Sequence, residues 1–250
     1  MRSDFLSVLE FHKKFDLPLN SKPVPMDDEA GAFRIGFLRE EAVEYEEAYR
    51  EGNLVGMVDA LIDFVYVACG TGLFIGCPRT GVLGQWPTYM DIREWAYKQH
   101  LFTTYDVPHI LSPGLYAFVR SGLDTNVNLF VLAHEAAVKE EPAALGLSLY
   151  LLKQCCAVAY LAAAMMQVPW ERCFACVQRA NMSKVRADPN GSNSKRLSRY
   201  DVVKPKTWVA PDARIMMELE LFGWKAPEKM RADIVTGRVE MDLTEGGTNA

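Results

Sequence analysis

Several glutamates lie where an amphipathic helix should be apolar. In residues 28–50 the apolar side chains recur with the period of an α-helix. At about 100° per residue, Glu41 and Glu44 fall within the apolar face and Glu40 falls at its border. A carboxylate on a buried face does not stay ionised unless another group offsets the cost of desolvation. These glutamates are therefore the first candidates for a functional site.

The next helical segment, residues 54–75, repeats the anomaly. Asp59 and Asp63 are its only charged residues, and their spacing of four puts them on one helix face. The two segments are joined by a short turn around Gly52, so we expect an antiparallel hairpin in which the carboxylates converge. Such close like charges repel unless a hard cation lies among them. Oxygen ligands without His or Cys suit Mg²⁺, with Mn²⁺ as an alternative.

Two structural interpretations compete with a metal site. The Glu-rich residues 39–51 are also typical of a solvated helix face. Asp59 and Asp63 could instead pair with a buried arginine or tyrosine. The same anomaly in two adjacent helices favours the metal site over either alternative.

A later segment carries the opposite charge. Residues 179–206 contain eight lysines and arginines against two aspartates, whereas the whole chain has 27 basic and 32 acidic residues and a formal charge of −5. A dedicated nucleic-acid binder would show a basic surplus overall, so we expect no nucleic-acid partner. The segment is either a solvated basic loop or the group of cations that meets phosphates bound at the acidic hairpin.

The elements that must position these residues are helical, and the predicted class is all-α. Helices are expected at residues 5–15, 28–50, 54–75, 129–140, 144–167, 170–182 and 211–222. Residues 79–128 give no clear assignment, and residues 244–250 are expected to form a mobile tail. We interpret residues 1–250 as one domain with residues 79–145 as an insertion.

Membrane and disulfide classes are disfavoured. Two apolar stretches, residues 54–78 and 154–170, are too short or too polar for a spanning helix and are expected to be buried. The N-terminus lacks a long apolar segment, so we expect no signal peptide and a cytoplasmic location. Six cysteines in a chain of this length do not indicate a disulfide framework, and Cys173-x-x-Cys176 has no second ligand pair to complete a zinc site.

Three motifs in order resemble one known superfamily. Glu40-Glu41-x-x-Glu44 followed by the Asp59 to Asp63 segment resembles the EExxE…ExxD signature of the all-α NTP pyrophosphohydrolases. That superfamily includes MazG, the dimeric dUTPases and phosphoribosyl-ATP pyrophosphohydrolase. The sequences FHKKFDLP at residues 11–18 and RANMSK at residues 179–184 resemble the entry and closing motifs of its phage and bacterial branch.

The resemblance implies roles for the acidic residues. Glu41, Glu44 and Asp63 would bind Mg²⁺, and Glu40 would be a further ligand or would orient the attacking water. The chain departs from the signature because Ala60 stands where the ExxD glutamate is expected. Asp59, one turn earlier, could supply the displaced carboxylate, so the number of bound metals stays open.

The resemblance also implies a reaction. A (d)NTP and water would give a (d)NMP and pyrophosphate, with a purine deoxynucleotide such as dGTP favoured as substrate. Phosphoribosyl-ATP is the alternative substrate, and a catalytically inactive helical interaction module is the alternative from another class. The expected substrate contacts are Asn181, Lys184, Arg179 and Arg196.

The implied fold is a MazG-like helical bundle. In one hypothesis its insertion contains a degenerate second helix pair, in which residues 134–139 align with 39–44 and residues 151–153 with 61–63. Lys153 would then stand where Asp63 stands in the first pair. We further expect a homo-oligomer, dimer or tetramer, no membrane partner, and the host cytoplasm as location if a phage encodes the chain.

Overall fold

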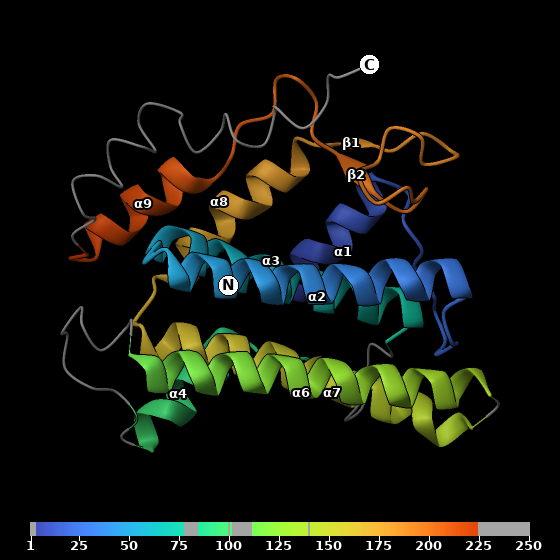
Figure 1. Cartoon of the computed structure of the whole chain (residues 1–250), viewed down its shortest axis with the longest axis horizontal. Coiled ribbons are helices and arrows are strands. Elements are labelled where there is room, and N and C mark those ends of the chain that lie inside the picture. Colours follow the sequence, from blue (N-terminus) through green and yellow to red (C-terminus); the bar gives the residue numbers. More distant parts are fainter. Residues whose placement is uncertain (1–3, 78–84, 100, 102–111, 140, 225–250) are drawn as a thin grey trace.

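A computed structural model describes residues 4–77, 85–99, 101, 112–139 and 141–224 of the protein. The described part is mostly helical, as predicted (Figure 1). Its helices are α1 (Asp4–Lys14), α2 (Asp28–Arg50), α3 (Leu54–Ile75), α4 (Tyr89–Lys98), α6 (Pro113–Val138), α7 (Pro142–Met165), α8 (Trp170–Met182) and α9 (Asp212–Leu221). Two short strands, β1 (Val185–Arg186) and β2 (Val202–Val203), pair antiparallel in the basic segment.

The predicted bounds of α2 and α3 are confirmed, because strong local signals set them. The Asp27 side chain caps α2, and the Asn53 side chain caps α3 by accepting a hydrogen bond from a backbone N–H. Gly52, between the helices, has a φ of 67°, and Gly76 ends α3 with a φ of 92°. These left-handed conformations suit glycine, so the turn and the end of the hairpin are encoded locally.

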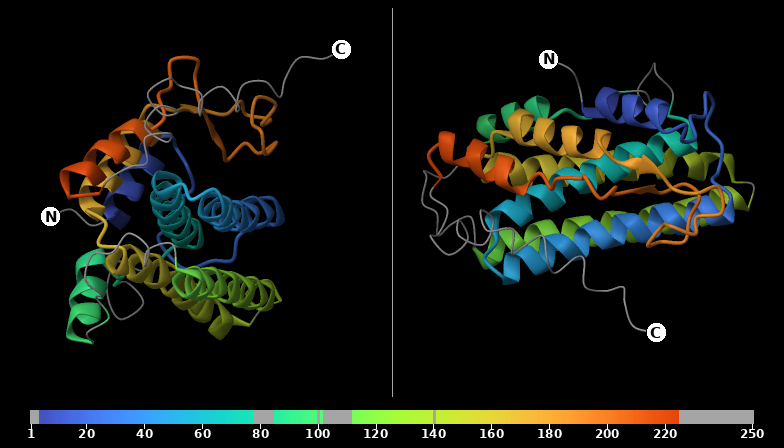
Figure 2. Two further views of the ribbon diagram at one scale, coloured as in Figure 1. Left: turned by 60° about the vertical axis from the view of Figure 1, so that its left-hand side comes forward. Right: turned by 90° about the horizontal axis from the view of Figure 1, so that it is seen from above.

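Two antiparallel helical hairpins form the body of the molecule. The α2–α3 hairpin packs on the α6–α7 hairpin, with α2 against α6 and α3 against α7. The end-on view in Figure 2 shows the four helices as a bundle, with α1, α8 and α9 beside α3. A second helix pair therefore lies against the first. Its origin as a degenerate copy stays a hypothesis.

The expected start of the helix at 129–140 was wrong, because α6 begins at Pro113 and runs to Val138. Glycines, asparagines and a mixed pattern lower the apparent helix propensity of its first half. Gly122 has a tertiary role there, since a Cβ atom at this position would lie 3.0 Å from a Val158 side-chain carbon on α7. The close approach of α6 and α7 thus favours glycine at this position, although glycine is a poor helix former. The predicted tail at 244–250 lies outside the described residues.

Two helices are long and apolar enough by composition to cross a membrane. They are Leu54–Ile75 and Ala143–Met165, and 89% and 67% of their apolar windows are buried inside the structure. Both therefore pack as core helices of the bundle. All six cysteines are buried and free, including Cys173 and Cys176.

Candidate functional site

The acidic residues of the hairpin differ in their exposure. Glu41 is 3% exposed, whereas Asp59 and Asp63 are half-buried on α3. Glu44 is exposed, so the expectation that it lies in the middle of the buried face was wrong. A helical wheel gives the direction of a side chain but does not show whether a neighbouring element covers it. Glu44 lies at the rim of the group that Glu41 and the two aspartates form.

The carboxylates of the hairpin lie close enough for their charges to affect one another. Burial raises the pKa of Glu41, and the charges of Asp63, Glu44 and Asp59 raise it further. Burial also raises the pKa of Asp59, again with a contribution from Asp63. The hairpin therefore carries four carboxylates whose mutual repulsion and desolvation both oppose ionisation.

The donor set suits a hard cation in its chemistry. Glu41 Oε2 and Asp59 Oδ1 are buried carboxylate oxygens without a hydrogen-bond partner among the described residues. Such oxygens are ligands of the kind that Mg²⁺ prefers. In the described part of the chain, however, no three His, Cys, Asp or Glu side chains are grouped closely enough to hold a metal ion. The carboxylates thus fit Mg²⁺ as a ligand set but are not assembled around one point.

The closing motif of the sequence reaches α3 from the end of α8. The Asn181 side-chain amide donates a hydrogen bond to Asp63 Oδ1 at 3.4 Å. Burial raises the pKa of Asp63, and the positive charge of Lys184 is the strongest influence that lowers it. Burial lowers the pKa of Lys184, and Asp63 opposes this shift. The structure therefore places Asn181 and Lys184 beside a predicted metal ligand.

Buried arginine and tyrosine side chains do not account for the two aspartates. Arg34 Nε donates to Thr71 Oγ1 at 3.0 Å, and its Nη2 donates to the Val67 carbonyl. The Tyr66 hydroxyl donates to Gln178 at 2.8 Å. Within the described ranges no hydrogen bond joins these groups to Asp59 or Asp63. The alternative that the aspartates serve as structural partners is not supported.

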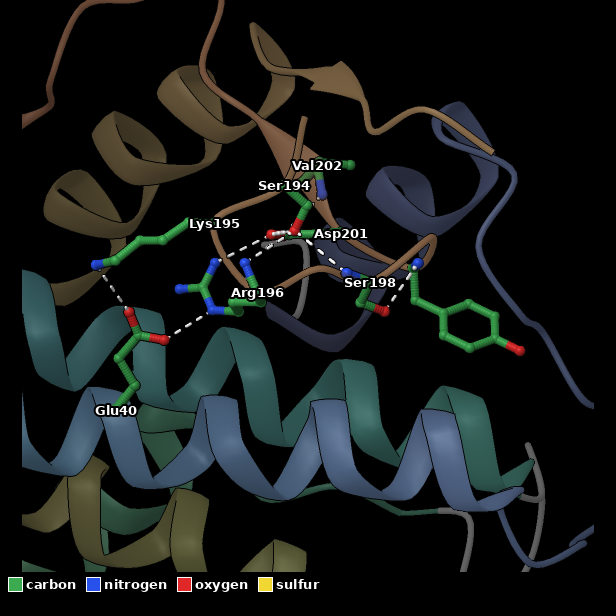
Figure 3. A network of polar contacts seen from close by, with 8 residues as sticks. Glu40, Ser194, Lys195, Arg196, Ser198, Asp201 and Val202 are labelled. Atoms are coloured by element: carbon green, nitrogen blue, oxygen red, sulfur yellow. Dashed lines mark hydrogen bonds and ion pairs between the residues drawn. The ribbon is translucent and has the colours of Figure 1, made fainter. Parts of the chain in front are cut away.

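Glu40 faces the basic segment. Arg196 Nε donates to Glu40 Oε2 at 2.7 Å, and Lys195 Nζ lies 3.7 Å from Glu40 Oε1 (Figure 3). The Arg196 guanidinium also lies 3.9 Å from the centre of the Phe37 ring. The segment after β1 therefore folds back onto α2 beside the acidic cluster, and Arg196 joins the two.

Arg179 is not brought to the same place. It is exposed on α8, and its charge acts on the Cys176 thiol, whose pKa is raised chiefly by burial. Two residues along a helix correspond to a rotation of about 200°, so Arg179 and Asn181 point to opposite sides of α8. The structure separates Arg179 from the predicted substrate contacts.

Sequence reasoning missed Asp201. It is 3% exposed and accepts hydrogen bonds from Ser194 and Arg196. The available signal was its position as one of only two acids in a strongly basic segment. An acid in such a segment suggests a partner for one of the surrounding cations, but the sequence does not show which cation it pairs with.

The α2–α3 hairpin carries carboxylates on both helices, and the charge of Lys184 acts on Asp63. Residues 8–83 match the family model described as Phosphoribosyl-ATP pyrophosphohydrolase. This part of the chain is therefore similar to that family, which is part of the all-α NTP pyrophosphohydrolase superfamily. No curated protein and no solved structure matches the chain.

The family match includes the acidic residues from Glu40 to Asp63 but not the basic segment at 179–206. Family membership of this domain suggests a pyrophosphohydrolase that acts on a nucleotide.

Proposed function

We propose that this protein is a Mg²⁺-dependent nucleoside triphosphate pyrophosphohydrolase, which converts a (d)NTP and water to a (d)NMP and pyrophosphate. The observation that carries the proposal is the hydrogen bond from Asn181 to Asp63, at a place where the charge of Lys184 also acts on Asp59 and Asp63. Buried carboxylates beside a lysine can accept a cation on one side and a phosphate on the other. The family match of residues 8–83 supports the same reaction class.

In this proposal Glu41, Glu44, Asp59 and Asp63 hold the Mg²⁺ ion. When bound, the ion would neutralise charge on the phosphates and lower the pKa of an attacking water. Among the chain's own groups, Lys184 contributes a positive charge next to Asp63 and Asn181 orients the Asp63 carboxylate. Both come from the end of α8, so the motif at residues 179–184 and the acidic hairpin act together.

Glu40 has a separate role in the proposal. Its carboxylate is held by Arg196 and Lys195, so it is fixed next to the cluster rather than within it. A fixed carboxylate at this position suits the orientation of a water molecule better than the coordination of the metal. Arg196 supplies a further positive charge for the phosphates.

The substrate we favour is a purine deoxynucleotide such as dGTP. Phosphoribosyl-ATP is the second candidate, because the matching family model is named for it. We also propose a cytoplasmic location. We further propose a homo-oligomeric state, and analytical ultracentrifugation of the full chain would test that state.

The test is turnover of a substrate panel. The full chain is incubated with Mg²⁺ and each (d)NTP or phosphoribosyl-ATP, and both the nucleoside monophosphate and pyrophosphate are quantified. We expect stoichiometric release of the two products from at least one substrate, and loss of turnover with a chelator. Failure to hydrolyse any member of the panel would contradict the proposal and favour the inactive interaction module.

A further inference from the structure

Asp201 is the centre of a buried polar network in the basic segment. Its Oδ2 accepts hydrogen bonds from Ser194 Oγ at 2.7 Å and from Arg196 Nη1 at 3.3 Å, while its Oδ1 accepts one from the Val202 N–H at 2.9 Å (Figure 3). Ser194 Oγ in turn accepts from the Arg196 backbone N–H at 3.0 Å. The network therefore fixes both the backbone and the side chain of Arg196.

The Arg196 guanidinium is held on two edges. Nε donates to Glu40, and Nη1 donates to Asp201. One face of the guanidinium lies against the Phe37 ring. Nη2 has no hydrogen-bond partner within the described residues, and in Figure 3 it points away from Asp201 and Ser198. The side chain of Arg196 is 25% exposed, so the guanidinium is not closed off from solvent.

We propose that Asp201 is a positioning residue, which holds Arg196 so that its free Nη2 meets a phosphate group of the substrate. This inference rests on the proposed function. A planar guanidinium binds phosphate best when its orientation is set in advance, because little rotational freedom is then lost on binding. Asp201 provides that orientation from inside the segment, and Glu40 provides it from α2. The ligand that the site would take is a di- or triphosphate.

The surrounding contacts explain why a carboxylate is used. An amide at this position could still accept the Ser194 hydrogen bond, but it would not carry the charge that pairs with Arg196. With the Asp201 ion pair lost, the guanidinium of Arg196 would keep its hydrogen bond to Glu40 and its contact with the Phe37 ring. Glu40 would then be the only carboxylate that orients the guanidinium, and the direction of Nη2 would no longer be fixed.

The experiment is a double-mutant cycle on the full chain with Mg²⁺. The variants are Asp201→Asn, Arg196→Gln and the double variant, and the readouts are kcat and KM for the triphosphate found active. We expect Asp201→Asn to raise KM about tenfold with kcat changed by less than about threefold. The double variant should be no worse than Arg196→Gln alone, because Asp201 acts through Arg196.

Asp188→Asn is the matched control. Asp188 lies in the same segment and accepts a hydrogen bond from Ser192, and among the described residues its carboxylate makes no ion pair with Arg196. Its substitution should leave KM unchanged. Circular dichroism and thermal melting of every variant report whether the fold is kept. If Asp201→Asn does not fold, Ser194→Ala removes one contact of Asp201 and replaces it in the cycle.

Two kinetic results would overturn the inference. One is an unchanged KM in folded Asp201→Asn, and the other is a double variant whose loss equals the product of the single losses. A wild-type chain that hydrolyses no triphosphate would refute the proposed function instead. In that case calorimetric binding of inorganic pyrophosphate with Mg²⁺ decides the role of Asp201. Weaker binding by Asp201→Asn but not Asp188→Asn supports it, and equal binding by both refutes it.

Discussion

The two helical hairpins of the bundle share an architecture but differ in their charged residues. In the α2–α3 hairpin, α3 carries Asp59 and Asp63 in an otherwise uncharged helix. In the α6–α7 hairpin, the only charged residue of α7 is Lys153, which is buried with its ammonium 5.9 Å from the centre of the Trp86 ring. A hairpin of this kind therefore packs without a carboxylate cluster.

The comparison of the two hairpins shows that packing of this kind does not need the acids of the first hairpin. Burial raises the pKa values of Glu41 and Asp59, which shows that ionising them in the folded protein has a cost. The second hairpin covers the other side of α3 and avoids that cost. Acids that oppose stability on α3 and are missing from its counterpart α7 indicate a functional demand.

The largest expected effect comes from removing the charge of Glu41. Glu41→Gln should lower kcat/KM by at least about 100-fold, because a proposed metal ligand is lost. The melting temperature should stay the same or rise, because a buried, repelled charge is removed. Steady-state kinetics and thermal melting measure both quantities.

Glu44 and Glu135 sharpen this comparison. Glu44→Gln should abolish activity as well and leave the melting temperature the same or higher, because it removes a charge that raises the pKa of Glu41 and is itself repelled by Asp63. Glu135→Gln on α6 changes the residue that aligns with Glu40 in the second hairpin and should leave kcat/KM within about twofold. Full activity of Glu41→Gln or Glu44→Gln would remove that residue from the proposed ligand set.

The next effect concerns the contact between the hairpins. Tyr116 of α6 stacks on Tyr49 of α2 with ring centres 4.1 Å apart and lies near Tyr45. Tyr116→Ala should lower the free energy of unfolding by about 2–3 kcal/mol through lost burial and stacking. Urea denaturation measures it. Tyr150→Ala, on an exposed position of α7, is the control and should cost less than about 1 kcal/mol.

The pH dependence of stability should include a contribution from His12. Burial lowers the pKa of His12 from 6.5 to about 3, so the unfolded chain binds a proton that the folded protein does not. Stability should therefore fall by about 1 kcal/mol for each pH unit from 6.5 towards 4. His12→Gln keeps a donor for the Pro18 carbonyl, 3.1 Å from Nδ1, and should flatten this dependence.

The carboxylates of the first hairpin act in the opposite direction, because their raised pKa values favour the folded state as the pH falls. The difference between wild type and His12→Gln isolates the histidine. If urea denaturation gives the same dependence of stability on pH for wild type and His12→Gln, burial does not keep His12 neutral in the folded protein.

The smallest effect is expected at Lys153. Burial lowers the pKa of Lys153, so its charge is a cost in the second hairpin. Lys153→Met should leave activity unchanged. The free energy of unfolding should rise by less than about 1 kcal/mol, because a buried charge is removed. Calorimetric melting gives the stability and the pyrophosphate assay gives the activity. A large loss of activity would show that the second hairpin has a part in the reaction.

Much of the first hairpin could be predicted from the sequence. Asp27, Asn53 and Gly76 mark the ends of α2 and α3 by local chemistry, and those bounds were predicted correctly. The burial of Glu41 also followed from helical periodicity. The start of α6 could not be predicted in this way, because Gly122 is explained by the approach of α7 rather than by its own helix.

The sequence by itself determined the all-α class, the acidic hairpin and the opposite charge of residues 179–206, because periodicity, capping and charge are local properties of a chain. The tertiary structure alone decided which cations meet which acids. It placed Lys184 beside Asp63, joined Arg196 to Glu40 and Asp201, and turned Arg179 away. Those partners lie far apart along the chain or on different faces of a helix, and only the packing of α8 and the basic segment on α2 and α3 brings them together.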